Sequence, residues 1–268
     1  MKVFISSDIE GTCGIAGWQE TSAGGIGYEY IAKQMTKEVS AVAKVALSAG
    51  AESVFVRDAH DTGCNILQKE LPNKTEIMRG WTGDIYNMMS GIDMAKYGAV
   101  MMTGYHSPAR SVASPISHTM QPYVESMKIN GELCSEFMLN AYTAGYFGIP
   151  VCFVSGDEGI CEIAKELIPE IKTAPVLKGV GGATISMQPE DALDLIKEQA
   201  EAALTDEHYK KCIVELPRSF EIQINYKEHP MAYKNSFYPG AIQVSGTKLR
   251  YKSTNYIDVL RFVHFCAN

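Results

Sequence analysis

The sequence predicts an α/β protein with a three-layer α/β/α core around a mostly parallel sheet and a smaller C-terminal α+β part. Over the first 205 residues, short apolar segments alternate with helical patterns, which is typical of a parallel sheet covered on both faces. The 268 residues are 46% hydrophobic, enough for a sizeable core. After about residue 211 the periodicity changes. We therefore divide the chain into residues 1–205 and residues 206–268.

The strands and helices of the core are predicted from short apolar runs and from apolar residues at helical spacing. The predicted strands are residues 2–7, 53–56, 99–102 and 151–154. The predicted helices are residues 28–49, 133–146, 158–168 and 189–204. Gly50 ends the first helix. Strand and helix therefore follow one another as in a parallel sheet.

The C-terminal part has a different pattern. Residues 212–216 and 220–224 alternate between apolar and polar side chains on either side of Pro217, and residues 254–266 have the spacing of a closing helix. This combination predicts the smaller α+β part.

Three connections stand out between these elements. Residues 105–130 and 225–240 are rich in Pro, Ser and Tyr, and the first is long enough to suggest a functional loop. The run Gly179-Val180-Gly181-Gly182 is not followed by the Lys-Ser/Thr of a phosphate-binding loop. We interpret it as a flexible connection.

Composition excludes several classes of function. The 24 basic and 31 acidic residues give a net charge of −7 without a basic block, so we expect neither a nucleic-acid nor a membrane partner. The apolar start is too short for a signal peptide and no segment approaches a membrane span, which predicts a cytoplasmic protein. Seven cysteines without a C-x-x-C pair suggest neither a disulfide framework nor a thiolate zinc site.

Acidic residues and histidines follow the predicted strands. Asp8 and Glu10 follow the first strand, His60 the second and His106 the third. Because the carboxyl ends of parallel strands meet at one sheet edge, these side chains are expected to lie together. Imidazole favours zinc over magnesium.

Two further residues are candidates for the same edge. His118 lies in the long loop 105–130, and Glu136 opens a helical stretch that leads into the fourth strand. Glu136 is the weaker of the two, because Glu132 lies one helical turn earlier and a surface carboxylate is the default.

Each strand-end residue also has a purely structural interpretation. Asp8 and Glu10 could be turn or capping carboxylates, but Gly11 follows directly at the strand end and favours function. A single His60 or His106 would more often be a hydrogen-bonded structural residue. Their joint position beyond successive strands favours a site.

A phosphatase is one alternative. The run Asp8-x-Glu10-Gly-Thr is similar to the Asp-x-Asp-Gly-Thr nucleophile motif of haloacid-dehalogenase-type phosphatases, which would make Asp8 a nucleophile and magnesium the cofactor. Gly156-Asp157-Glu158 would then supply the later acidic motif. Against it, Glu10 replaces the second Asp of that motif and the three histidines stay unexplained.

The combined motifs resemble the DppA-type D-aminopeptidases, which are cocatalytic zinc peptidases of the dipeptide-transport operon type. The resemblance is collinear through at least residue 175. The matching motifs are Ser6-x-Asp8-x-Glu10-Gly11, Asp58-x-His60, Gly104-Tyr105-His106, Ser117-His118-x-Met120 and Ser135-Glu136 followed by Leu139-Asn140-Ala141-Tyr142.

The resemblance implies a set of roles. Asp8 would bridge two Zn²⁺ ions per chain, with Glu10 and His106 completing one site, and His60 and Glu136 completing the other. His118 would be the catalytic histidine. The resemblance further implies hydrolysis of short peptides by metal-activated water, including peptides with N-terminal D-amino acids. It also implies a decamer of two stacked pentameric rings.

A third hypothesis is a metal-bound protein that captures peptides without turnover. It is motivated by the link to a transport operon and by a C-terminal region that matches no family pattern. A binding module gains nothing obvious from open metal positions beside a histidine, which favours the dinuclear zinc aminopeptidase.

Overall fold

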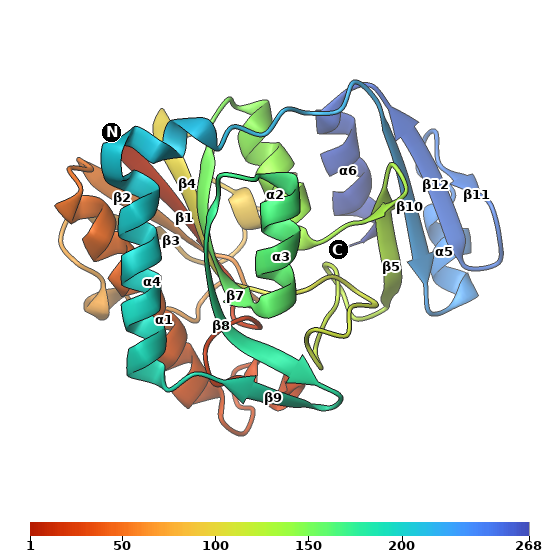
Figure 1. Cartoon of the computed structure of the whole chain (residues 1–268). Helices are drawn as coiled ribbons and strands as arrows, with labels where there is room; N and C mark the ends of the chain where they lie inside the picture. Colours follow the sequence, from red (N-terminus) through yellow and green to blue (C-terminus); the bar gives the residue numbers. More distant parts are fainter. Residues whose placement is uncertain (268) are drawn as a thin grey trace.

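The computed structural model describes residues 1–267, which form two sheets that lie side by side (Figure 1). The larger sheet has seven strands in the order β3-β2-β1-β4-β7-β8-β9, and every neighbouring pair is parallel except β8 with β9. Its strands are β1 (Lys2–Ser7), β2 (Ser53–Asp58), β3 (Thr75–Met78), β4 (Tyr97–Tyr105), β7 (Val151–Asp157), β8 (Lys172–Val180) and β9 (Ala183–Ser186). The predicted α/β class with a mostly parallel sheet is confirmed.

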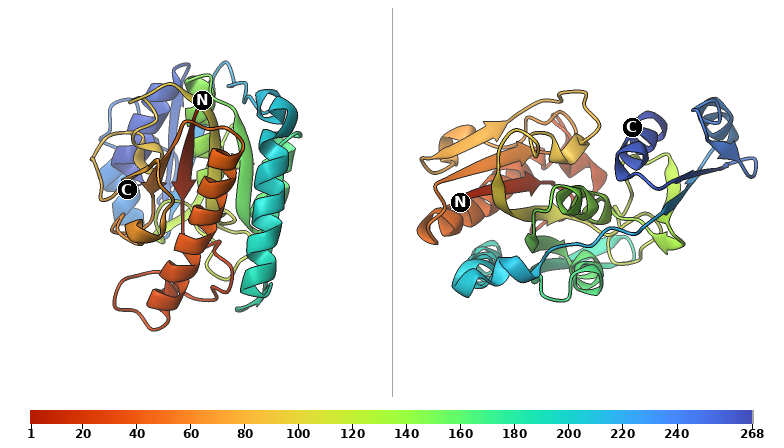
Figure 2. Two further views of the ribbon diagram at one scale, coloured as in Figure 1. Left: turned by 90° about the vertical axis from the view of Figure 1, so that its left-hand side faces the viewer. Right: turned by 90° about the horizontal axis from the view of Figure 1, so that it is seen from above.

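Helices cover the larger sheet. These helices are α1 (Tyr28–Ser48), α2 (Glu136–Tyr146), α3 (Glu158–Leu167) and α4 (Pro189–Leu204). The helices α1 and α4 pack side by side (Figure 2), and α3 packs on β7 and β8. Short 3₁₀ turns are η1 (Trp18–Glu20), η2 (Gln68–Glu70), η3 (Asn87–Met89) and η4 (Thr205–Lys211).

The second sheet is antiparallel, in the order β11-β12-β10-β5-β6. Its strands are β5 (Val124–Ile129), β6 (Glu132–Leu133), β10 (Phe220–Tyr226), β11 (Ile242–Gln243) and β12 (Lys248–Ser253). Two helices accompany it, α5 (His229–Asn235) and α6 (Tyr256–Cys266), and α6 lies between the two sheets (Figure 1). This sheet therefore combines a hairpin from the middle of the chain with strands from its last part.

Several segments differ from the sequence-based expectation. The loop predicted at 105–130 contains all of β5, and the connection predicted at 225–240 contains α5. Residues 212–216 are not a strand, although the Cys212 carbonyl accepts a hydrogen bond from Val151 N–H at 3.0 Å. The glycine run 179–182 closes the β8–β9 hairpin. The pattern of β8 was hidden because it contains Pro175, which normally argues against a strand.

Two glycines allow the ends of β1 and β4 to approach closely. A Cβ atom on Gly11 would lie 1.8 Å from the Tyr105 carbonyl oxygen, and one on Gly104 would lie 2.2 Å from the Asp8 carbonyl oxygen. Gly104 also has a φ of +68°, which disfavours other residues. The backbone contact is completed by a hydrogen bond from Gly11 N–H to the Gly104 carbonyl at 2.7 Å. The residues that follow both strands are thereby held together.

Within residues 1–267, every helix is too short or too polar to cross a bilayer.

Candidate metal centre

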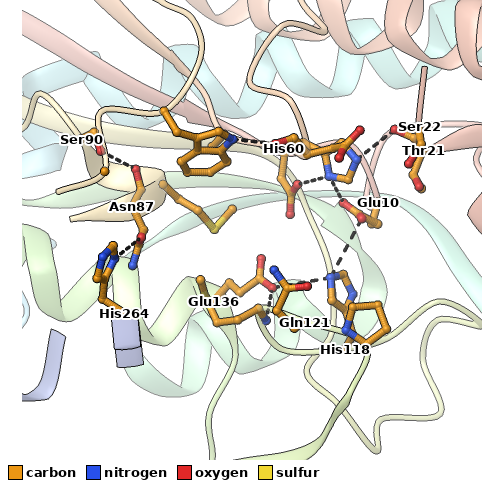
Figure 3. Close-up of a pocket in the computed structure, with 18 of the residues that line it drawn as sticks. Glu10, Thr21, Ser22, His60, Asn87, Ser90, His118, Gln121, Glu136 and His264 are labelled. Carbon is orange, nitrogen blue, oxygen red and sulfur yellow. Dashed lines mark hydrogen bonds and ion pairs between the residues drawn. The ribbon is translucent and has the colours of Figure 1, made fainter. Parts of the chain in front are cut away.

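The structure brings all six predicted site residues together. Two follow β1, one follows β2, one follows β4, one opens α2 and one lies in the loop before β5. Five are buried and His60 is partly buried. Figure 3 shows Glu10, His60, His118 and Glu136 around the cavity that they line. The full set is Asp8, Glu10, His60, His106, His118 and Glu136.

The donor atoms form two groups. In the first, His60 Nδ1 lies 3.4 Å from Asp8 Oδ1 and 3.0 Å from Glu10 Oε2. We call Asp8, Glu10 and His60 the β1–β2 group. Its donor atoms all lie within 4.8 Å of one another, which is close enough to hold one ion.

The second group is built around Glu136. His106 Nε2 lies 3.4 Å from Glu136 Oε2, and His118 Nε2 lies 3.7 Å from Glu136 Oε1. We call His106, His118 and Glu136 the β4–α2 group. Asp8 connects the two groups, because its other oxygen, Oδ2, lies 3.5 Å from His106 Nε2.

These contacts pair the ligands differently from the family resemblance. The resemblance places Glu10 with His106 and His60 with Glu136, whereas here Glu10 contacts His60 and His106 contacts Glu136. The reason is topological: β1 lies between β2 and β4, so one side of Asp8 faces the loop after β2 and the other faces the loop after β4.

Backbone carbonyls orient all three imidazoles. His60 Nε2 lies 2.9 Å from the Thr21 carbonyl, His106 Nδ1 lies 2.9 Å from the Ser107 carbonyl, and His118 Nδ1 lies 3.1 Å from the Ile116 carbonyl. A ring N–H donated to each carbonyl turns the other nitrogen toward the carboxylates, where its lone pair would bind a metal ion. This is the arrangement that fixes metal-ligating histidines in proteins. The rings of His106 and His118 also stack, with centroids 4.2 Å apart.

Buried hydrogen bonds hold the supporting elements in place. The Tyr105 hydroxyl lies 2.7 Å from Ser6 Oγ and accepts a bond from Asn140 Nδ2 at 2.8 Å, which connects β1, β4 and α2 beneath the site. Asp157 Oδ2 accepts the Ser107 N–H at 2.6 Å beside His106.

The role of Asp157 also bears on the phosphatase alternative. Its carboxylate caps α3 through Ile160 N–H and accepts a bond from the Ser107 hydroxyl. Within residues 1–267, Asp157 is not among the residues that line the cavity beside the donor cluster. The acidic motif that a phosphatase would need is therefore a structural cap in this protein.

The electrostatics of the site favour a bound cation. Burial and the neighbouring Glu10 carboxylate raise the pKa of Asp8 well above its usual range. Burial alone would raise the pKa of Glu10 too, but nearby His60 holds it well below its usual value. Burial and the neighbouring His106 lower the pKa of His118, which keeps this imidazole neutral.

Unpartnered polar atoms test whether a metal fits. Asp8 Oδ2, Glu10 Oε2 and His106 Nε2 are buried and have no hydrogen-bond partner within residues 1–267. Buried polar atoms normally have partners, so three orphans in one cluster indicate a missing ligand. Carboxylate oxygens with imidazole nitrogens, and no thiolate, fit zinc well.

The cluster opens into a cavity of about 470 Å³. Asn87 and His264 lie at the end away from Glu10 and His60 (Figure 3), with His264 Nδ1 3.3 Å from Asn87 Oδ1. Sequence reasoning missed this wall and both tryptophans that line the cavity, Trp18 and Trp81. Tryptophans in polar loops were the one available signal.

The chain is similar to known proteins over nearly its whole length. The model of the M55 peptidase family, described as D-aminopeptidase, matches residues 1–265. A D-aminopeptidase of Bacillus subtilis (strain 168) is 28% identical over 262 residues, covering 96% of this chain and 93% of the relative. A solved structure, described as the Zn-dependent D-aminopeptidase DppA from Bacillus subtilis, a self-compartmentalizing protease, matches with a TM-score of 0.92. It is 26% identical and the match covers 100% of this chain and 97% of that one.

Proposed function

The chain belongs to the M55 D-aminopeptidase family, and from this premise we propose that it is a dinuclear zinc aminopeptidase for short peptides, including peptides that begin with a D-amino acid. One observation carries the proposal: Asp8 directs one carboxylate oxygen toward His60 and the other toward His106. A carboxylate placed in this way can bridge two metal ions, as in other two-metal hydrolases.

The contacts suggest how the ligands are shared. Glu10 and His60 would complete one zinc site, and His106 and Glu136 the other, with Asp8 common to both. Each ion would then have three protein ligands, which leaves positions open for water and substrate as catalytic zinc requires. The family resemblance implies the alternative pairing, with Glu10 and His106 at one ion and His60 and Glu136 at the other, and Asp8 is common to both ions in either case.

His118 is the residue left for proton transfer. When bound, zinc supplies Lewis acidity at the scissile carbonyl and lowers the pKa of water. His118 Nε2 faces the same cluster, 4.0 Å from Glu10 Oε1, while its Nδ1–H is held by the Ile116 carbonyl. A neutral imidazole in this position accepts a proton at Nε2 and returns it to the leaving amine.

Metal content and peptide hydrolysis, measured on the same sample, test the proposal. Protein purified without chelators or added metal should contain about two zinc ions per chain by mass spectrometry, and should release the first residue of D- or L-dipeptides. Two zinc ions with peptide binding but no product would instead favour the peptide-binding hypothesis. Little zinc, with phosphate-ester hydrolysis in magnesium, would favour the phosphatase.

The assembly is part of the same proposal. Since the solved relative is described as self-compartmentalizing, we infer that this chain also forms the decamer of two pentameric rings expected from the family. Ten chains of 29.4 kDa give about 294 kDa, which light scattering after size exclusion would detect. A monomer mass near 29 kDa at working concentrations would contradict it.

A further inference from the structure

We propose that the two tryptophans of the chain, Trp18 and Trp81, select peptides with a bulky apolar side chain beside the scissile bond. This proposal rests on the proposed function, because it assigns a specificity to the same cavity. We call Trp18 and Trp81 the tryptophan pair. The chain contains no other tryptophan, and both line the cavity that holds the metal donors.

Both indoles remain accessible in a concave site. Trp18 is 43% exposed and Trp81 is 45% exposed, although large aromatic rings are usually more deeply buried. Met88, Met120 and Pro122 line the same cavity and add apolar surface. Accessible aromatic surface within a cavity is typical of a ligand site.

Trp18 is held against the candidate catalytic histidine. Its ring meets the His118 ring nearly edge to face, with centroids 5.1 Å apart and planes at 66°. The turn that carries it is fixed by Glu20, whose Oε2 accepts the backbone N–H groups of Ala16 at 2.7 Å and Gly17 at 3.0 Å. A substrate side chain on this ring would therefore lie beside His118.

Trp81 is held beside the β1–β2 group of donors. Its Nε1–H donates to the carbonyl of Asp61, the residue after His60, at 2.5 Å. The guanidinium carbon of the buried Arg57 lies 4.3 Å from the ring centroid. Because the N–H is satisfied and a cation covers the ring, the surface left for a ligand is apolar.

The rest of the lining favours an apolar side chain over an acidic one. Within the described chain, no lysine or arginine lines the cavity, so an acidic side chain would find no cationic partner apart from the metal ions. Asp61 and Asp84 line it instead, and they would repel such a side chain. Rigid, pre-positioned indoles lose little entropy when a ligand packs on them.

Paired peptides test the selection by activity. Dipeptides that differ only by alanine or phenylalanine at the first residue, or at the second, give a phenylalanine-to-alanine ratio of kcat/KM for each position. We expect a ratio of about tenfold or more at one position, and a fall of about tenfold in that ratio in Trp18→Ala or Trp81→Ala.

A matched variant controls for the loss of an exposed aromatic ring. Tyr146 is 47% exposed, lies at the end of α2 and does not line the cavity, so Tyr146→Ala should leave the ratio as in the wild type. A wild type that prefers alanine at both positions, or a ratio that neither tryptophan variant changes, would overturn the proposal.

Tryptophan fluorescence supplies a readout that does not depend on turnover. All tryptophan emission of this chain arises from the cavity. Reduced-amide analogues of the same dipeptides cannot be cleaved, and the phenylalanine analogue should change the emission at a concentration about tenfold lower than the alanine analogue. If emission shows this preference but no peptide is hydrolysed, the tryptophan pair stands and the proposed function fails. Hydrolysis without any preference in emission would leave the proposed function standing and overturn the role of the tryptophan pair.

Discussion

Two buried glutamates in this protein contrast the candidate metal centre with an ordinary polar contact. Glu10 in the donor cluster and Glu38 on α1 are each 1% exposed. Their pKa values nevertheless move in opposite directions. The pKa of Glu10 lies well below its usual range, whereas burial raises the pKa of Glu38 to about 7.

The difference comes from the partners of each carboxylate. Glu38 Oε1 accepts only neutral donors, the Cys13 N–H at 3.0 Å and Gln34 Nε2 at 3.2 Å. Glu10 is surrounded by imidazoles, and the charge on His60 stabilises its ionised form. Burial of a carboxylate therefore does not by itself distinguish the donor cluster from other polar contacts. Positive charge beside Glu10 is what separates these two glutamates, and a metal ion would supply more.

The largest effect should follow from removing the carboxylate shared by the two donor groups. We expect the Asp8→Asn protein to bind neither zinc ion, because both ions lose a ligand. Its kcat/KM should fall by at least about 10³-fold. Metal analysis and dipeptide hydrolysis measure the two effects together. Glu38→Gln is the matched control, since it replaces an equally buried acid outside the cluster and should keep about two zinc ions. An Asp8→Asn protein that kept its zinc and activity would refute the bridging role.

A comparison of two histidines separates ligand from proton carrier. His118→Asn should lower kcat by about 10² to 10⁴ while the zinc content stays at about two, because proton transfer is lost and both ions remain. His60→Asn should lose one zinc ion, since only Asp8 and Glu10 would remain in its group. Loss of zinc from the His118 variant would show instead that His118 is a ligand.

Glu38 predicts a pH dependence of stability that arises outside the donor cluster. Its folded pKa of about 7 exceeds the ordinary value of 4.5. Between pH 4.5 and pH 7, the carboxyl is therefore protonated in the folded state and ionised in the unfolded state. Stability from this group is therefore full below about pH 4.5 and falls as the pH rises to about 7. The difference corresponds to about 3 kcal/mol.

Glu38→Gln isolates this contribution. Because glutamine is neutral at every pH, the variant should unfold at higher urea than the wild type at pH 8, and the gap should shrink toward pH 5. Measuring the difference between the two proteins cancels the other titrating groups. A gap that stays constant from pH 5 to pH 8 would show that Glu38 does not titrate in this range.

The smallest effect should come from breaking an ion pair that is exposed to solvent. Glu190 lies 3.4 Å from Lys37 across α1 and α4, with both side chains largely exposed. Lys37→Ala should change the free energy of unfolding by less than about 1 kcal/mol, because water and salt screen exposed pairs. Urea denaturation at low and high salt would check this, and a loss above about 2 kcal/mol would mean that the pair behaves as a buried one.

The sequence predicted the edge of the parallel sheet better than the cavity above it. Asp8, His60 and His106 were found because strand ends in such a sheet must meet. His118 and Glu136 were weaker candidates on position alone, and the family resemblance gave them roles. The wall formed by His264 was missed, since it depends on how α6 packs between the sheets. The packing of one helix between two sheets has no signature in the local periodicity of the sequence.

The order of the site along the chain has a consequence for biosynthesis. Every proposed metal ligand lies between residues 8 and 136, whereas β7 and β8, which extend the sheet, and α6, which closes the cavity, come later. As the protein leaves the ribosome, all of these proposed ligands emerge before the elements that shield them. A nascent chain stalled near residue 170 would thus expose a full ligand set to the cell's metal pool.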